Sequence, residues 1–162
     1  MLMLLSGETA EVSPVVIIIF VAVIIGVTFF CMKMSSDQTV ATIKKRFAGQ
    51  ILAECELRTP GCCSFITQDS FLIQSNANCF LAFPLADIAY VHPYRDVSSR
   101  QWYFALRDKE GKNKNLNCSM ICANGKVKQL KTPPLVAMSH ADTLKLSEFL
   151  MSAAPHIQMA EK

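Results

Sequence analysis

Val15-Val-Ile-Ile-Ile-Phe-Val-Ala-Val-Ile-Ile-Gly-Val-Thr-Phe-Phe-Cys-Met32 is a run of 18 residues without a single charge. It lies inside a longer segment, residues 12–32 between Glu11 and Lys33, in which no residue is charged. As an α-helix rising ~1.5 Å per residue, the run would be about 27 Å long. Because the hydrocarbon core of a bilayer is ~30 Å thick, we predict a transmembrane helix over residues 15–32.

A cleaved secretory signal and a buried soluble helix both fit this run less well than a membrane span. A signal has a basic start and small residues at its cleavage site, whereas residues 1–32 contain no Lys or Arg and the run ends in Phe29, Phe30, Cys31 and Met32. A buried helix of a soluble protein needs a large surrounding core, and a chain of 162 residues is too short to enclose a helix that is apolar on all sides. The sequence therefore favours a membrane anchor.

The two flanks of the run differ in charge, and this difference predicts its orientation. Glu8 and Glu11 precede the run, whereas the residues that follow it include Lys33, Lys44, Lys45 and Arg46. Basic residues stay on the cytosolic side. We therefore expect a single-pass protein of the cell membrane, with residues 1–14 outside and the rest of the chain in the cytosol.

The basic residues could also serve a partner. The chain has a formal net charge of +3, which suits a domain beside anionic lipid headgroups. The alternative is that these charges only set the topology and solvate a surface. They are too few and too mixed with acids to predict nucleic-acid binding. Within the run, Ala22 and Gly26 form a small-xxx-small pair, which is a hypothesis for a homodimer contact.

Of the seven cysteines, Cys31 lies at the membrane boundary and the other six are expected in a reducing compartment, so we expect no disulfides. Their spacing contains no C-x-x-C pair, only the adjacent Cys62 and Cys63 and the pair Cys118 and Cys122. We expect them to pack as small apolar residues. The alternative is a metal or redox site that uses these four cysteines. We predict no cofactor.

Residues 33–50 are expected to form a basic juxtamembrane connector helix. Val40, Ile43 and Phe47 recur on one helical face, and Gly49 is placed to end the helix. One interpretation is a connector that lies near the membrane surface. The other is an amphipathic segment that packs on the domain that follows.

From Ile51 onward, short apolar runs separated by turn residues predict an antiparallel β domain of about seven strands. The expected strands cover 51–57, 63–67, 71–75, 79–83, 88–94, 101–107, 114–122 and 126–131. We predict that 101–107 and 114–122 form one hairpin, and that Asn124-Gly125 closes a second hairpin with 126–131.

A single helix is expected to close the domain. Ser139 and Asp142 have the spacing of a capping box, and Leu146, Phe149 and Leu150 form an apolar stripe that must be buried on the sheet. Pro155 is expected to end the helix and residues 155–162 to form a frayed tail. The predicted fold class is α+β.

This order of strands and helix resembles the pleckstrin-homology-like domains of small bacterial membrane proteins. Two stretches within residues 51–154 carry the resemblance, Phe65-Ile-Thr-Gln-Asp-Ser-Phe-Leu-Ile73 and Phe83-Pro-Leu-Ala-Asp-Ile-Ala-Tyr-Val91. The family often has an Arg in the first stretch, where this chain has Ser70 or Phe71, so no ligand-binding residue is transferred. The resemblance implies a scaffold or binding module without enzyme activity.

The function favoured by the sequence is a non-enzymatic binding module at the inner face of the membrane, with a protein partner or anionic lipid headgroups. Its expected contact surface is Tyr90, His92, Tyr94 and Arg95, because Tyr and Arg are enriched in interface centres. The alternative is that these rings are ordinary sheet or core residues. We assign Trp102, Phe104 and Leu106 to the core. An enzyme is less favoured because the chain lacks a glycine-rich phosphate loop, H-E-x-x-H and G-x-S-x-G.

Overall fold

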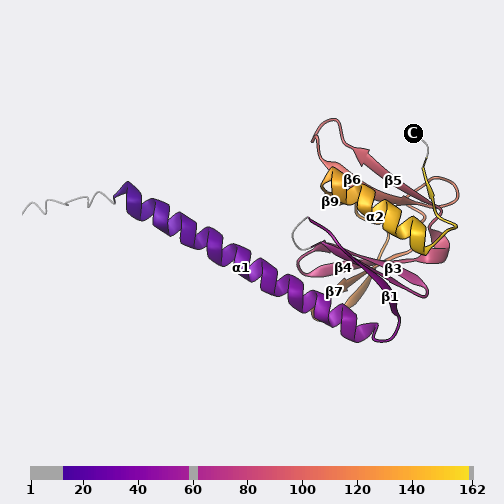
Figure 1. Ribbon diagram of the computed structural model, residues 1–162, viewed down its shortest axis with the longest axis horizontal. Helices are drawn as coiled ribbons and strands as arrows, with labels where there is room; N and C mark the ends of the chain where they lie inside the picture. The colour runs from indigo at the N-terminus through magenta and orange to yellow at the C-terminus, as the bar shows by residue number, and fades with distance from the viewer. Residues whose placement is uncertain (1–12, 59–61, 161–162) are drawn as a thin grey trace, which may run out of the picture. The chain divides into compact units, whose positions relative to one another are not determined.

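The computed structural model describes residues 13–58 and 62–160, and it divides the chain into two compact units, Met1–Cys31 and Met32–Lys162 (Figure 1). Most of the expected segment 1–14, including Glu8 and Glu11, lies outside the described residues.

The first unit contains the beginning of α1 (Pro14–Arg46), and the side chains of its apolar run are exposed. Within the described residues, α1 is the one helix long and apolar enough to cross a membrane. The backbone groups of such a helix are satisfied inside the segment, which suits a lipid environment. The helix predicted over 15–32 is therefore present, with the length and composition of a membrane span.

The second unit begins with the remainder of α1. The expected separate connector helix over 33–50 is not observed, because α1 continues without a break to Arg46. Ser36 lies buried within the helix and accepts a hydrogen bond of 2.9 Å from Nε2 of Gln74. Gly49 follows the helix with a φ of 77°, a left-handed conformation that suits the turn after a helix end.

Six antiparallel strands form the first sheet, which we call sheet A. Their order is β1-β2-β3-β4-β7-β8, and their bounds are β1 (Ile51–Glu56), β2 (Cys63–Thr67), β3 (Ser70–Asn76), β4 (Cys79–Pro84), β7 (Cys118–Cys122) and β8 (Val127–Leu130). A short 3-10 helix, η1 (Leu85–Asp87), leads out of this sheet.

Sheet B has four strands in the order β10-β5-β6-β9. Their bounds are β5 (Tyr90–Arg95), β6 (Trp102–Arg107), β9 (Val136–Met138) and β10 (Gln158–Met159). The strand β10 pairs parallel to β5, and the other pairs are antiparallel. The α+β class is confirmed, but the described residues form more than the expected seven strands, in two sheets.

One of the two predicted hairpins is wrong. The strands β6 and β7 belong to different sheets, since β6 pairs with β5 and β9 whereas β7 pairs with β4 and β8. The hairpin through Asn124-Gly125 is confirmed, and Gly125 has the φ of 77° that such a turn requires.

The main core lies between sheet A, sheet B and the C-terminal helix α2 (His140–Ala153). Phe71 and Leu81 of sheet A, Phe104 of sheet B and Leu146 and Leu150 of α2 are all buried in it. The helix packs against β5, β6 and β1 (Figure 1). Of the predicted apolar stripe, the burial of Leu146 and Leu150 is therefore confirmed, and Phe149 is partly buried against the same core.

A second core covers the opposite face of sheet A. Ile43 of α1 is buried there against Phe65, Leu72, Phe80 and Ile121, with Val40 and Phe47 packed beside it. Of the two interpretations of residues 33–50, the structure shows the amphipathic segment packed on its own domain.

Polar contacts along α1 accompany this second core. Thr39 Oγ1 donates to the carbonyl of Ala77 at 2.7 Å, and Thr42 Oγ1 donates to that of Ala123 at 3.1 Å. Farther along, Arg46 donates to the carbonyl of Gly125 at 3.3 Å. The helix thus holds the β3–β4 turn and the β7–β8 turn at the same time.

The start of α2 matches the predicted capping box. Ser139 is the N-cap, and its hydroxyl accepts from the Asp142 backbone N–H at 3.1 Å and donates to Asp142 Oδ2 at 2.8 Å. The same carboxylate accepts from the backbone N–H of Arg58 at 2.8 Å, so the cap also holds the segment after β1.

The expected frayed tail is wrong for the described residues after Pro155. Ile157 is buried in the main core, and the Gln158 and Ala160 backbone N–H groups donate to the carbonyls of Ala89 and Val91. These bonds attach the chain end to β5, so the tail is part of sheet B.

We predict that Ile43→Ala lowers the free energy of unfolding of the second unit by about 2–5 kcal/mol, because it opens a cavity under a side chain that is 0% exposed. The measurement is urea unfolding of the full chain in mild detergent, followed by Trp102 fluorescence. The matched control is Ile25→Ala, at a site in the same helix that is 51% exposed. Equal stability of the two variants would contradict the packing described here.

Candidate functional site

A row of aromatic side chains lies on the face of sheet B that points away from the main core. Successive residues of a strand point to opposite faces, so Tyr90, His92 and Tyr94 share this face while Val91 is buried in the core. Strand pairing places Tyr103 opposite Tyr94 and Arg107 opposite Tyr90. We call Tyr90, His92, Tyr94, Tyr103 and Arg107 the aromatic face, and all five are half-buried.

Three of these rings stack on one another. The centroids of His92 and Tyr94 are 5.4 Å apart with an interplanar angle of 23°, and those of Tyr94 and Tyr103 are 5.7 Å apart with an angle of 26°. Stacked rings hold each other in place and have few rotatable bonds, so they lose little conformational entropy when a partner covers them.

The neighbours of the aromatic face also affect its charge. Burial, together with the positive charge of Arg107, lowers the pKa of His92 from its usual 6.5. Burial, and then the neighbouring Tyr103, raise the pKa of Tyr94 above 10.0. Neutral His92 and Tyr94 therefore lie beside the guanidinium of Arg107 at neutral pH.

Three of the four residues of the expected contact surface share one face of sheet B, and the fourth does not. Tyr90, His92 and Tyr94 share a face as predicted, but Arg95 alternates to the other face and its Nε donates to the carbonyl of Arg100 at 3.3 Å. Sequence reasoning missed Tyr103 and Arg107. The alternation of side chains along 101–107 predicts their position. If Trp102, Phe104 and Leu106 face the core, Tyr103 and Arg107 must lie on the opposite face.

Trp102 differs from its expected place in the core. Phe104 and Leu106 are buried as predicted, whereas Trp102 is half-buried at the start of β6. Its ring stacks on His140 of α2 with centroids 3.9 Å apart. This pair joins the start of α2 to sheet B.

The four cysteines that could have formed a metal site are not brought together. Cys118 is buried in the main core, whereas Cys63 packs against the second core on the other face of sheet A. Burial raises the pKa of Cys118 to about 11 and that of Cys63 to about 12, so both are thiols at neutral pH. Across residues 13–58 and 62–160, no group of three or more His, Cys, Asp or Glu side chains is arranged to hold a metal ion.

Two of the four basic residues after the run have partners within the second unit. Lys44 forms an ion pair of 2.8 Å with Glu54 and lies 5.6 Å from the ring centroid of Phe65. Arg46 donates a hydrogen bond to the β7–β8 turn, and all four basic residues are exposed.

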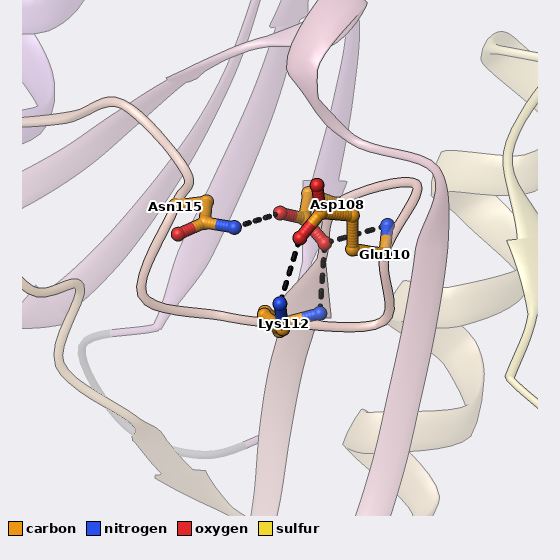
Figure 2. Close-up of polar contacts among 4 residues, drawn as sticks. All are labelled: Asp108, Glu110, Lys112 and Asn115. Carbon is orange, nitrogen blue, oxygen red and sulfur yellow. Dashed lines mark hydrogen bonds and ion pairs between the residues drawn. The ribbon is translucent and has the colours of Figure 1, made fainter.

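The loop that joins β6 to β7 is organised by one carboxylate. Asp108 accepts from the backbone N–H groups of Glu110 and Lys112 at 2.9 and 2.8 Å and from Asn115 Nδ2 at 2.7 Å (Figure 2). These hydrogen bonds lower its pKa. The carboxylate is used by its own loop, so we assign it a structural role.

A small cavity lies beside the main core, lined by residues that include Phe104, Asn113 and Pro133, and its volume is about 10 Å³. This is the space of about one water, whereas small-molecule sites are typically ~300–1,000 Å³. The aromatic face is therefore a better candidate for binding than this cavity.

Comparisons of the chain with protein-family models, with curated proteins and with solved structures found no match. The resemblance to pleckstrin-homology-like domains thus stays a prediction from the sequence.

We predict that His92 titrates below pH 6.5 in the folded protein, and that Arg107→Gln raises its midpoint without restoring 6.5, since burial is the larger cause. As the pH falls, the unfolded chain takes up this proton first. The contribution of neutral His92 to the free energy of unfolding is therefore fully present above pH 6.5. It is lost as the pH falls from 6.5 through the lower midpoint of the folded protein. NMR of histidine-labelled full-length protein gives the midpoint, with His92→Gln for assignment. A midpoint at or above 6.5 would contradict the burial of His92.

Proposed function

We propose that this chain is a membrane-anchored, non-enzymatic binding module at the inner face of the cell membrane, and that the aromatic face binds a protein partner. The observation that carries the proposal is the stacked row of His92, Tyr94 and Tyr103 on the outer face of sheet B. Tyr and Arg side chains are those that most often dominate binding energy at interfaces. Arg107 supplies a positive charge to this surface.

The length and composition of α1 support the anchor in this proposal. Lys33 directly follows the apolar run and is exposed, which suits the cytosolic end of a span. The second unit would then lie in the cytosol, and residues 1–14 outside.

A protein partner is favoured over anionic lipid headgroups by the positions of the basic residues. Lys44 lies twelve residues beyond Met32, which is ~18 Å along the helix axis and beyond the ~8 Å screening length of physiological salt. Lys44 and Arg46 are also engaged within the second unit. Of the four basic residues, Lys33 is the one that lies next to the apolar run, where it would be close to lipid headgroups.

The order of strands supports the finer assignment of the fold as pleckstrin-homology-like. Without the β7–β8 hairpin and the short β10, the chain has β1 to β4 in one sheet, β5, β6 and β9 in the other, and then α2. Seven antiparallel strands followed by one helix is the order on which the resemblance is based. In this proposal the β7–β8 hairpin is an addition that extends sheet A.

The small-xxx-small pair remains a hypothesis for self-association. Ala22 and Gly26 are four residues apart in α1 and lie on one face of the helix. Apart from its two chain neighbours and the adjoining helix backbone, a Cβ at Gly26 would meet no atom of the described chain within 4 Å, so that surface is open to a second helix.

We predict that Tyr94→Ala and Tyr103→Ala each lower the recovery of a stoichiometric protein partner at least about tenfold, because each removes a central ring of the aromatic face. The measurement is purification of the full-length protein in mild detergent with quantitative identification of what is retained. The control is Leu52→Ala, which removes a 65% exposed apolar side chain from sheet A and should leave recovery unchanged. Retention by both tyrosine variants, or retention of phospholipid alone, would overturn the proposal of a protein partner.

We also predict that a tag after Lys162 is labelled by an impermeant reagent only when cells are opened, because the basic end of the span should face the cytosol. A tag before Met1 should be labelled in intact cells and serves as the internal control. Labelling of the C-terminal tag from outside intact cells would contradict the proposed orientation.

A further inference from the structure

Two cysteines that are distant in the sequence face each other across neighbouring strands of sheet A. Cys79 begins β4 and Cys122 ends β7, and the strand pairing places them directly opposite. Their sulfur atoms are 3.6 Å apart, and both side chains are half-buried. The four cysteines singled out by their spacing in the sequence include Cys122 but not this partner.

The backbone around the pair has the geometry in which a bridge fits. The Ala123 N–H donates to the carbonyl of Asn78 at 2.8 Å, so residues 78 and 123 form a hydrogen-bonded pair. Because the two kinds of pair alternate, the next pair, Cys79 and Cys122, is a non-hydrogen-bonded pair. Accordingly, the Cys122 N–H donates to the carbonyl of Lys126 and not to Cys79. Such pairs have Cα atoms ~4.5 Å apart, within the ~4.4–6.8 Å that disulfides span.

The hydrogen bond within the pair separates the roles of the two sulfurs. Burial, followed by the hydrogen bond that its thiol donates to Cys122, raises the pKa of Cys79 to about 11. Cys122 is the acceptor in this hydrogen bond, so its sulfur is the one that we expect to attack first.

We propose that Cys79 and Cys122 are a reversible dithiol–disulfide site whose oxidant is a small disulfide of the glutathione type. Cys122 loses its proton and attacks one sulfur of the small disulfide, which forms a mixed disulfide and releases one small thiolate that takes up a proton. Cys79 then loses its proton and attacks the Cys122 sulfur, which forms the Cys79–Cys122 bond and releases the second small thiol. Two electrons pass to the small disulfide, and the two protons end on the two released thiols.

The position of the pair predicts what the bond would do. Cys79 follows the β3–β4 turn and Cys122 precedes the β7–β8 turn, and Thr39 and Thr42 of α1 hold these two turns. A bond between the cysteines would join both turns covalently beneath α1. We expect it to raise the melting temperature of the second unit by about 10 °C, because a disulfide that closes a loop of this length usually stabilises the folded state by an amount that corresponds to such a shift. This inference does not depend on the proposed binding function.

The test is oxidation of the full-length, folded protein in mild detergent with oxidised glutathione, followed by peptide mapping without reduction. We expect one intramolecular link between Cys79 and Cys122, a mass loss of two hydrogens, the higher melting temperature, and reversal of all three by dithiothreitol. Cys79→Ser and Cys122→Ser should abolish the link and the shift.

Cys63→Ser is the matched control and should preserve both the link and the shift, because Cys63 lies in the second core and its sulfur has Gln74 as its neighbour at 3.5 Å. A glutathione adduct that persists on Cys122 without closing, a link that appears only after unfolding, or equal linking among the other cysteines would each overturn the proposal. The map of the unsubstituted protein decides among these outcomes even where a serine variant fails to fold.

Discussion

The burial of sheet A on both faces is the constraint on which the rest of this structure depends. The main core covers one face and the end of α1 covers the other through Ile43. A sheet covered on both sides has strands that are buried at nearly every position, and four consecutive residues of β2 and of β3 are buried here. Without the end of α1, the face that carries Phe65, Leu72 and Phe80 would be exposed to water. The helix end is therefore part of the fold of the second unit.

Sheet B is built differently, and this difference gives the protein its candidate binding surface. The core covers one face of this sheet, so Val91 and Phe104 are buried, while Tyr90, His92, Tyr94 and Tyr103 alternate with them and point to the other face. A surface of this kind is usually polar, yet here it carries Tyr90, His92, Tyr94 and Tyr103. Stacking holds His92, Tyr94 and Tyr103 in position, which suits the proposed binding of a partner.

Local signals in the sequence predicted the elements well, whereas their pairing depended on long-range contacts. The apolar run, the Asn124-Gly125 turn and the Ser139 cap each have a local physical cause, and each is present in the structure. The pairing of β6 with β7 was wrong because adjacency in sequence favours a hairpin, while burial of Phe104 and Cys118 places the strands in separate sheets. Cys79 and Cys122 likewise lie opposite each other because β4 and β7 are neighbours in sheet A, and no local sequence pattern indicates that pairing.

Hydrogen exchange of the backbone amides of residues 39–47 in the full-length protein tests the central claim most directly. If the end of α1 is a buried part of the second unit, these amides should exchange only as fast as those of β3 and β4, since all of them open with the same unfolding event. Exchange of residues 39–47 as rapid as that of the exposed loop 97–100, while β3 and β4 stay protected, would contradict the account.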